Sequence, residues 1–465
     1  MQNYLIRNIS IVNEGKTVSS DLLIKNGRIE KIATGIKPSF AVTEINGEGK
    51  YLLPGAIDDQ VHFREPGLTH KATIYTEARA AVAGGITSFM EMPNTVPPAF
   101  TQDLLEQKYA RAANSSLANY SFYMGTSNEN ADEALRTNDK RRDICGIKIF
   151  MGSSTGNLLV DNYLTLDKLF RESGVLIATH CEDEKIIRRN LERLKKENRE
   201  LRASDHPVIR DEEACFESSL TAIQFAKKYD SRLHIFHLST EKEMQLFSNL
   251  LPLAEKRITA EVCVHHLHFT SDDYAVLGNR IKCNPAIKAP HNREALWKAL
   301  LDDRLDLIAT DHAPHTLEEK GLVRNPDGTL SPAGGTADGT HAYEHAHAGL
   351  PLVQHSLLLM LRYVKEGRIS LEKMVEKMSH AVATCFRIEE RGFIREGYFA
   401  DLVIVDMDRP EKVTTDNILY KCGWSPLEGS SFPATVTHTF VNGRLVYGNG
   451  AFDESQLGQR LSFDR

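Results

Sequence analysis

The segment Leu305–His315, which reads LDLIATDHAPH, contains side chains that could bind a metal. An apolar run leads into Asp311, as in a strand that is buried on both faces and carries one acid at its end. A buried carboxylate is costly unless it is paired, protonated or bound to a metal, and His312 and His315 follow directly. The alternative is a capping Asp before a solvated loop, and this segment alone does not decide between the two.

Similar polar residues end other predicted strands. They are Gln60, His62 and Arg64 in the first strand, Asn94 in the second, Lys148 in the fourth, His180 in the fifth and His237 in the sixth. A single histidine at a strand end is more often structural than a metal ligand. Three histidines with a Lys and an Asp are hard to explain as core filling, because unpaired polar groups there would each cost several kcal/mol. The pattern therefore favours a metal site.

These residues need strands that end at one place, and the middle of the chain alternates strand and helix. The predicted strands are Ala56–Phe63, Thr87–Asn94, Tyr120–Gly125, Gly146–Met151, Leu176–Cys181, Leu233–Ser239, Ile258–His265 and Leu305–Asp311. Helical patterns between them include Tyr75–Ala83, Glu213–Lys228 and Arg293–Leu301. Eight such strands predict an α/β fold, a (β/α)8 TIM-like barrel whose strand ends meet at one mouth. A doubly wound open sheet is the alternative, but no Gly-rich phosphate turn follows the first strand.

Both ends of the chain are rich in β patterns. Tyr4–Val12 alternates, and Asp21–Ile32 contains an Asn26-Gly27 hairpin signal. Near the other end, Ala400–Asp406 and Thr437–Tyr447 have the same character. We therefore predict that residues 1–54 and 391–465 form one composite β-sandwich domain, and that residues 55–390 form the barrel.

Composition limits the class of protein. The 465 residues, 41% hydrophobic and 26% charged, are typical of a soluble globular protein with a large and a smaller domain. A net charge of -7 argues against nucleic acid as a partner, and no apolar stretch reaches the ~20 residues of a membrane helix. Seven cysteines without regular spacing, and a start without a secretory pattern, predict a cytoplasmic protein with reduced thiols.

Several motifs, in order, resemble one known family. They are PGAIDDQVHFREPG (54–67), MPNT (92–95), GIKIF (146–150), THCED (179–183), HIFHLST (234–240), EVCVHH (261–266), CNPAIK (283–288), IATDHAPHT (308–316), GYFADLVIVD (397–406) and SPLEG (425–429). Together they resemble the cyclic amidohydrolases of the metal-dependent amidohydrolase superfamily, and within them the class I-like dihydroorotases. The resemblance runs nearly end to end, so it is more specific than any single motif.

The resemblance implies a binuclear zinc site and metal-assisted hydrolysis. His62 and Asp311 would hold one zinc, His180 and His237 the other, and an N-carboxylated Lys148 would bridge both. The carbamate suits this place because an ammonium beside two cations would be strongly unfavourable; an ordinary snorkelling lysine is the alternative. Zinc would activate a water and polarise the ring carbonyl, and Asp311 would act as general base and then general acid.

The implied reaction is the reversible hydrolysis of (S)-dihydroorotate to N-carbamoyl-L-aspartate in pyrimidine (UMP) biosynthesis. Positions matching the family's substrate contacts are Arg64, Asn94 and His315 for a carboxylate clamp, and Asn284, Ala333 and Gly334 for the ring. Each could instead be structural, with Arg64 paired to Glu65 or Asn94 forming a turn. Hydantoinases and dihydropyrimidinases, which bind rings without the carboxylate, are the alternative function.

One position departs from the family, which usually has His-x-His where this chain has Gln60-Val61-His62. An amide oxygen is a weaker zinc ligand than imidazole. Gln60 could ligate through its oxygen, or His62, Lys148 and Asp311 could hold the first metal alone, so one or two zinc ions per chain are expected. The site could also be inactive, in a non-catalytic subunit that supports aspartate transcarbamoylase. The remaining ligands favour an active enzyme.

A second departure is the insertion at 336–350, TADGTHAYEHAHAGL, before a helix-like stretch near Leu352. His341, His345 and His347 suggest extra metal binding. The favoured alternative is a mobile polar loop, which as a lid would exclude water from the reaction. The resemblance gives His265 and His266 no metal role, so they are predicted to be structural or to support the site. Members of the family are often dimers or tetramers, and a homo-oligomer is compatible with the sequence.

Overall fold

The centre of the computed structural model is a closed parallel barrel; the structure describes all residues except 1, 153–156, 198–199 and 334–342. Its strands are β6 (Ala56–Val61), β7 (Ile86–Glu91), β8 (Asn119–Phe122), β9 (Met124–Gly125), β10 (Ile147–Phe150), β11 (Ile177–His180), β12 (Leu233–Ile235), β13 (Ile258–Cys263) and β14 (Leu307–Ala309). Because β8 and β9 are two parts of one strand, the hydrogen-bonded runs β6-β7-β8 and β9 to β14 supply eight strand positions. The barrel closes where the backbone N–H of His62 donates to the carbonyl of His312 at 2.7 Å. The predicted barrel is confirmed.

Most predicted strands extend beyond the hydrogen-bonded ladder. At β12 the strand ends at Ile235, although the predicted strand runs on to Ser239. Residues after a barrel strand leave the ladder and form the loops of the mouth, where catalytic groups are found in this architecture. The polar residues singled out by the sequence therefore lie mostly just after the strands.

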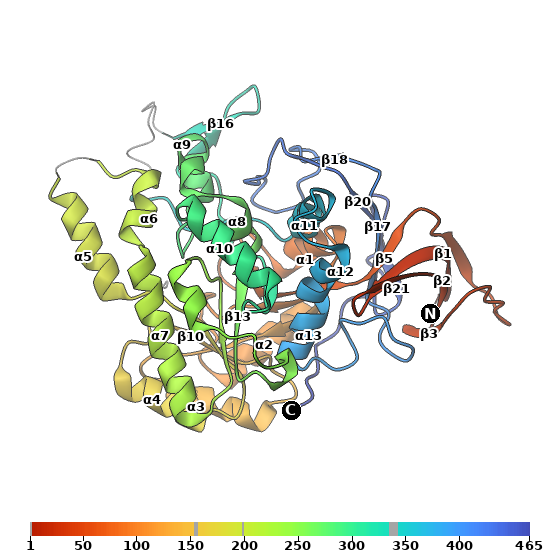
Figure 1. The fold of residues 1–465 in the computed structure, drawn as a ribbon, viewed down its shortest axis with the longest axis horizontal. Coiled ribbons are helices and arrows are strands. Elements are labelled where there is room, and N and C mark those ends of the chain that lie inside the picture. The colour runs from red at the N-terminus through yellow and green to blue at the C-terminus, as the bar shows by residue number, and fades with distance from the viewer. Residues whose placement is uncertain (1, 153–156, 198–199, 334–342) are drawn as a thin grey trace.

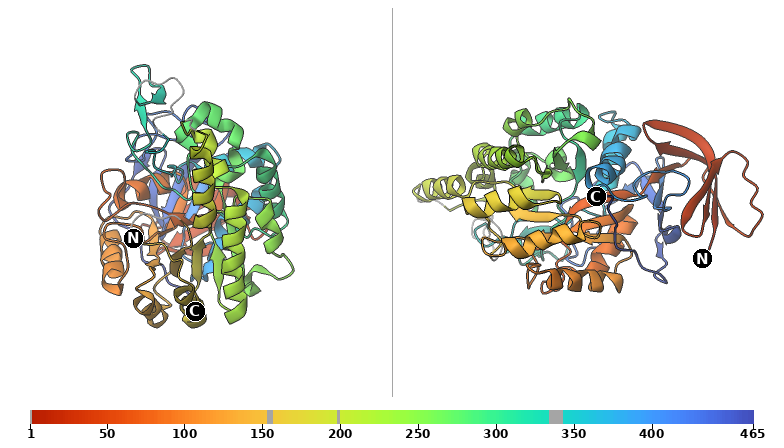
Figure 2. Two further views of the ribbon diagram at one scale, coloured as in Figure 1. Left: turned by 90° about the vertical axis from the view of Figure 1, so that its left-hand side faces the viewer. Right: turned by 90° about the horizontal axis from the view of Figure 1, so that it is seen from below.

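Helices cover the outside of the barrel (Figures 1 and 2). The longer ones are α1 (Ile74–Ala83), α2 (Gln102–Ala113), α4 (Tyr163–Glu172), α5 (Glu184–Lys195), α7 (Glu212–Tyr229), α10 (Pro290–Leu301) and α11 (Ser356–Lys365). The α7 helix begins where the Asp211 side chain accepts from the Ala214 N–H, and ends at Asp230 in the left-handed conformation. The three predicted helices correspond to α1, α7 and α10, whereas the stretch predicted near Leu352 becomes helical only at Ser356.

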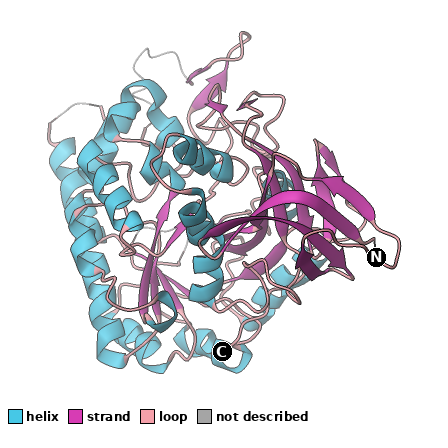
Figure 3. Cartoon of the chain, turned by 45° about the vertical axis from the view of Figure 1, so that its right-hand side comes forward, coloured by secondary structure: helices cyan, strands magenta, loops and turns pink. Residues whose placement is uncertain are grey.

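Strands from both ends of the chain form one sheet of nine strands beside the barrel (Figure 3). They are β1 (Tyr4–Asn13), β2 (Lys16–Lys25), β3 (Arg28–Ala33), β4 (Thr43–Asn46), β5 (Tyr51–Pro54), β17 (Leu402–Asp406), β20 (Thr435–Val441), β21 (Arg444–Gly448) and β22 (Ala451–Phe452). The ends meet where β17 pairs antiparallel with β5. Both predicted Asn-Gly turns are hairpins, and Asn26 and Asn442 have positive φ angles of 51° and 52° as such turns require.

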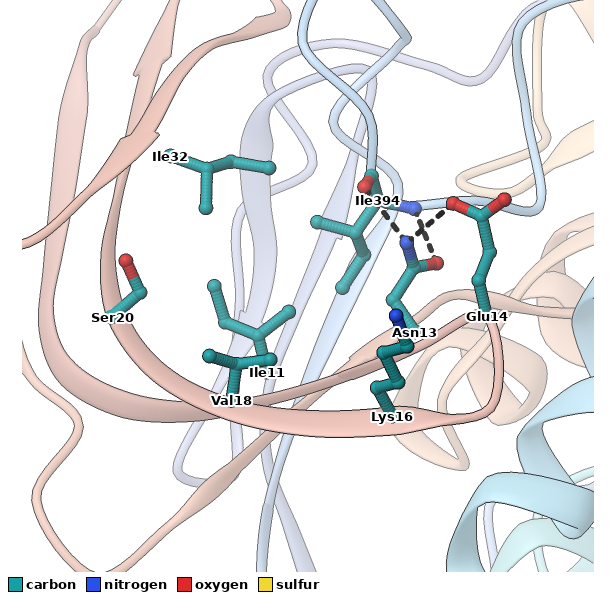
Figure 4. Close-up of a pocket in the computed structure, with 8 residues that line it drawn as sticks. All are labelled: Ile11, Asn13, Glu14, Lys16, Val18, Ser20, Ile32 and Ile394. Carbon is teal, nitrogen blue, oxygen red and sulfur yellow. Dashed lines mark hydrogen bonds between the residues drawn. The ribbon is translucent and has the colours of Figure 1, made fainter.

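A hollow on this sheet brings N-terminal and C-terminal residues together (Figure 4). The Asn13 side chain donates to the Ile394 carbonyl and accepts from the Ile394 N–H, both at 3.0 Å. The described residues that line the hollow include Ile11, Val18 and Ile32 but no histidine or cysteine. This hollow is therefore not the predicted metal site.

The C-terminal tail closes the end of the barrel away from the mouth. Leu461 and Phe463 pack in one buried cluster with Tyr123 and Phe236 of the barrel. The Arg465 guanidinium donates to the Cys145 carbonyl at 2.6 Å, just before β10. A site for substrate is therefore expected at the opposite end of the barrel, where the carboxyl ends of the strands lie. Among the helices of the described residues, none is both long and apolar enough to span a bilayer.

Candidate metal centre and substrate pocket

The carboxyl ends of the barrel strands surround a pocket of about 230 Å³. Its lining residues are Gln60, His62, Arg64, Asn94, Lys148, Phe150, His180, His237, Asn284, Asp311, Ala313, His315, His347, Ala348 and Gly349. Eleven of these were singled out from the sequence, ten as site residues and His347 as a possible ligand of an extra metal. The structure therefore brings into one pocket residues that are up to 289 positions apart in the chain.

His62 and Asp311 form the first close pair of potential ligands. Nε2 of His62 lies 3.1 Å from an Asp311 carboxylate oxygen, while Nδ1 lies 2.8 Å from Oδ1 of Asn94. An amide oxygen only accepts, so Nδ1 carries the proton in neutral His62 and Nε2 presents a lone pair to the carboxylate. Burial lowers the pKa of His62, which favours this neutral form. Two acceptors that face each other at this distance suit a cation between them.

His180 and His237 form the second pair. Nδ1 of His180 lies 2.9 Å from Nε2 of His237, and Nε2 of His180 lies 3.0 Å from the Glu182 carboxylate. Glu182 is fully buried and paired with the Arg210 guanidinium, and its pKa falls to about 2 despite the opposing effect of burial. The carboxylate fixes the His180 tautomer so that the Nδ1 lone pair faces the pocket, as in many metal-binding histidines. Nδ1 of His237 is buried without a hydrogen-bond partner.

Lys148 lines the same pocket as the two pairs and is only 1% exposed, which excludes a snorkelling side chain. Its amino group lies 4.1 Å from the centre of the Phe236 ring and 4.6 Å from that of Phe150. Burial lowers the pKa of Lys148 to about 7, although Cys181 and Asp311 favour the charged form. A substantial fraction is therefore the neutral amine at neutral pH, the form that can react with carbon dioxide.

Gln60 lines the pocket, but its amide oxygen is directed toward a cysteine. Oε1 lies 3.5 Å from the Cys263 thiol, which ends β13. Among the described residues, Gln60 makes no hydrogen bond to His62 or Asp311. Coordination of the first metal by Gln60 therefore stays a prediction.

Arg64 lines the pocket, and among the described residues its guanidinium forms no ion pair with a carboxylate. Nε donates to the Pro314 carbonyl at 3.2 Å, and a terminal nitrogen lies 3.1 Å from Nε2 of His315. The alternative pairing with Glu65 is not seen, because Glu65 accepts from the Ile74 N–H. Arg64 is 6% exposed, and burial lowers its pKa to about 10, so it keeps its charge. A buried guanidinium that opens on a pocket is suited to an anionic ligand.

The remaining predicted substrate contacts divide into two groups. Asn94 and Asn284 line the pocket, and Oδ1 of Asn284 also lies 3.0 Å from Nε2 of His206. Ala333 follows the strand β16 (Leu330–Pro332), and among the described residues it is not part of the pocket lining. The substrate contact of Ala333 therefore stays a prediction, and Gly334 lies outside the described residues.

His347, Ala348 and Gly349 also line the pocket and form a wall that was not predicted from the sequence, in which His347 had been considered only as a ligand of an extra metal. These residues end the predicted insertion, where the described part is held by two buried lysines. The Lys320 amino group donates to the His347 carbonyl at 2.9 Å and to the Gly349 carbonyl at 3.1 Å. Lys282 donates to the carbonyls of Tyr343 and Ala346. No sequence signal reveals this wall, because the lysines bind its backbone carbonyls and not its side chains. The predicted His341 lies outside the described residues.

The predicted extra metal site in the insertion is only partly reproduced. One ligand atom each of His347, His315 and Glu319 lie within 4.8 Å of one another. However, the Lys71 ammonium lies 2.9 Å from Glu319 and 3.2 Å from Nδ1 of His315. A positive charge is already present, which makes this group a poor metal site.

The donor set of the pocket fits two zinc ions. Two ligands at ~2.0–2.1 Å from a tetrahedral zinc are roughly 3.3 Å apart. The His62–Asp311 and His180–His237 separations of 3.1 and 2.9 Å are close to that spacing. Asn94 and Glu182 orient the two histidines from behind, and both pairs are neutral or negative. The residues present therefore fit a metal at each pair.

Comparison with known proteins gives a consistent result. The model of the "Amidohydrolase family" matches residues 51–446. A protein named dihydroorotase from Methanosarcina acetivorans is 31% identical over 459 residues, which is 96% of this chain and 92% of that protein. Another, from Pyrococcus furiosus, is 31% identical over 466 residues, which is 97% of this chain and 96% of that protein.

Solved structures show the same fold. An L-hydantoinase (dihydropyrimidinase) from Arthrobacter aurescens has a TM-score of 0.88 and 24% identity, with 97% of this chain and 98% of that chain covered. A dihydropyrimidinase from Brevibacillus agri has a TM-score of 0.85 and 22% identity, with both chains fully covered. At this identity the likeness supports the fold and not the substrate.

Proposed function

This chain belongs to the amidohydrolase family, and from that premise we propose that it is a zinc-dependent dihydroorotase. It would be a hydrolase of cyclic amides that opens (S)-dihydroorotate to N-carbamoyl-L-aspartate and closes it again, a step of pyrimidine biosynthesis. The similarity to proteins named dihydroorotase over nearly the whole chain supports this proposal.

The observation that carries the proposal is the buried Arg64 at the pocket. Among the described residues, Arg64 has no ion-pair partner, and its polar neighbours are a carbonyl and the His315 ring. A buried charge without a counter-ion is costly, and a substrate carboxylate would supply that counter-ion through paired hydrogen bonds. Dihydroorotate carries such a group, whereas hydantoin-type rings do not. His315 and the amide nitrogen of Asn94 would complete the clamp.

The same pocket supports the chemistry of ring opening. Zinc bound at the two ligand pairs would lower the pKa of a water and polarise the ring carbonyl. Lys148, carboxylated on its neutral amine, would complete both ligand pairs. Asp311, 3.1 Å from His62, would hold the proton released by the water and pass it to the departing ring nitrogen. Asn284, which also lines the pocket, would orient the ring.

Arg64→Ala tests the proposal with two substrates, dihydroorotate and dihydrouracil, which is the same ring without the carboxylate. Loss of charged hydrogen bonds worth about 3 kcal/mol should lower kcat/KM for dihydroorotate roughly 100-fold and spare dihydrouracil. Arg111→Ala, a half-exposed arginine whose nearest carboxylate is 4.0 Å away, is the matched control. Zinc per chain is measured on the same samples.

The outcomes separate the three functions. Equal loss on both rings would remove the clamp from the proposal. A wild-type preference for dihydrouracil would assign the protein to the dihydropyrimidinases. Full zinc content with no turnover in either direction would favour a non-catalytic subunit of aspartate transcarbamoylase, the function for which Gln60 is the only support.

We also propose that residues 1–54 and 391–465 form one β-sandwich domain and residues 55–390 the barrel. The sheet shared by both ends of the chain supports this division. The seven cysteines are all free, which fits the reducing cytoplasm.

A further inference from the structure

We propose that Cys263, His265 and His266 form a separate metal site next to the pocket, for a zinc-class divalent cation; Cys263 contacts Gln60 of the pocket lining. They lie at the end of β13 and in the short helix α8 (Val264–His268) that follows it. One ligand atom of each lies within 4.8 Å of the others, and the three residues are 0, 0 and 3% exposed. One thiol with two imidazoles is a donor set that zinc prefers. The site is distinct from the two ligand pairs of the pocket and does not depend on the proposed activity.

The hydrogen bonding of His266 prepares one of its nitrogens for a metal. Nε2 lies 3.1 Å from the Pro285 carbonyl, which can only accept, so Nε2 carries the proton. Nδ1 therefore presents a lone pair, and it is buried without a hydrogen-bond partner. A histidine held by a carbonyl on one nitrogen and free on the other is the usual arrangement of a metal ligand.

His265 adds a stronger anomaly, because neither of its ring nitrogens has a hydrogen-bond partner although the side chain is fully buried. The Thr310 backbone is near enough to affect its pKa but does not reach hydrogen-bond geometry. Leaving a buried polar group unpaired is unfavourable, and such groups in a native protein usually mark an ion or a water. Burial lowers the pKa of His265 to about 4, so it is the neutral form that would bind a cation.

The Cys263 thiol explains where the amide oxygen of Gln60 points. The thiol lies 3.5 Å from Oε1 of Gln60 and 3.9 Å from a Glu261 carboxylate oxygen. Burial and the surrounding carboxylates raise the pKa of this thiol well above its usual value, so a thiolate needs a cation beside it. Metal binding would break the S–H bond, form the metal–sulfur bond and release one proton to solvent. The Gln60 amide oxygen is then available as a fourth ligand.

Two other groups of potential ligands among the described residues contain a positive charge already. His234 lies between the carboxylates of Asp59 and Glu261, and its pKa is raised well above the usual value, so it is protonated. The group of His315, Glu319 and His347 contains the Lys71 ammonium. The cysteine group holds no such charge and has unpaired nitrogens, so it is the one that requires a cation.

Cobalt(II) added to the metal-free full-length protein tests the site without measuring activity. A thiolate ligand gives a sulfur-to-cobalt charge-transfer absorption in the near ultraviolet, which the ligands of the pocket cannot produce because none is a cysteine. We expect this band, with one proton released per cobalt bound there. The band should persist in His237→Ala, which damages the pocket site.

Cys263→Ser should abolish the band and lower the bound metal by one ion per chain. Cys181→Ser is the matched control, because Cys181 is also buried and adjoins His180 in sequence. His266→Gln, which keeps a polar side chain, is a second variant in case Cys263→Ser does not fold, and it should also lower the bound metal by one ion. A band that survives Cys263→Ser, or cobalt binding to the wild type without any band, would overturn the site. Dihydroorotate turnover is decided separately, so failure here leaves the proposed function intact.

Discussion

Three residues of the pocket have a backbone conformation that is rare for non-glycine residues. Arg64, His237 and Asp311 have φ angles of 68°, 40° and 47°. Such conformations cost of order 1–3 kcal/mol each and persist where surrounding contacts fix them. Each residue follows the end of a barrel strand, where the positive φ turns the side chain out of the ladder. This strain supports the assignment of the three residues to the site.

Lys148→Met tests the proposed bridge at the level of one side chain. The variant keeps a buried side chain of similar length but has no amine to carboxylate. We expect loss of bound zinc and a fall in kcat of more than ~10²-fold. Lys377→Met is the control. Lys377 is also 1% exposed, but its amino group donates to the carbonyl of Leu305, which precedes β14, whereas the pocket lies at the carboxyl ends of the barrel strands. Full metal and activity in Lys148→Met would exclude the carbamate.

Because His355 is buried, we predict that the free energy of unfolding of the protein depends on pH. Burial alone lowers its pKa to about 3, from about 6.5 in the unfolded chain. Below pH 6.5 the unfolded state gains a proton that the folded state does not, so stability is lost as the pH falls. Between pH 7 and pH 5 this residue should cost about 2 kcal/mol of unfolding free energy. Urea titrations at pH 7 and pH 5 should show that the wild type loses about 2 kcal/mol more unfolding free energy than His355→Gln does. Equal losses in the two proteins would contradict this role of His355.

At the scale of elements, the pocket wall at 347–349 depends on a close backbone approach. Gly349 has a φ of 145°, and a Cβ there would lie 2.4 Å from the Ala313 carbonyl oxygen. Gly349→Ala should therefore displace the wall and raise KM several-fold, with a smaller effect on kcat. Gly367→Ala is the control, since φ is 75° there but no atom lies within 4 Å of the added Cβ. If both variants keep the wild-type KM, the wall does not contact the substrate.

At the scale of the whole molecule, a buried network joins the terminal sheet to the barrel. The Asp401 carboxylate accepts from Asn119 of β8 at 3.1 Å and from the Asn442 N–H at 2.7 Å, and it pairs with Arg391. Asn442 also donates to Asn119 at 2.8 Å. The sheet and the barrel therefore share a desolvated ion pair, and they are expected to unfold together.

Asp401→Ala should destabilise both parts, because it leaves the Arg391 guanidinium buried without its partner, a loss of about 3–5 kcal/mol. Unfolding should remain a single transition at lower denaturant, followed by fluorescence and circular dichroism. Asp408→Ala, which removes an 86% exposed carboxylate paired with Lys365, should cost less than about 1 kcal/mol. Two separate transitions, with only one of them shifted, would show that the sheet and the barrel are independent.

The sequence by itself determined the strand and helix pattern, both Asn-Gly hairpins, the barrel and ten residues of the pocket. The elements and the strand-end residues follow from local rules, since apolar periodicity and turn residues act over a few positions and a barrel gathers all its strand ends, whereas Asn284 was identified only through the family resemblance. The sequence also showed that Gln60 stands where a histidine was expected.

Only the tertiary structure decided which polar atoms face each other. His62 meets Asp311 across 249 positions, Gln60 meets Cys263 across 203, and buried Lys320 builds a wall from backbone carbonyls. Hydrogen bonds across 32 and 19 positions fix the free lone pairs of His62 and His266, and no periodicity encodes them. The sequence therefore determined which residues reach the mouth of the barrel, whereas their ligand pairing depends on contacts that exist only in the closed fold.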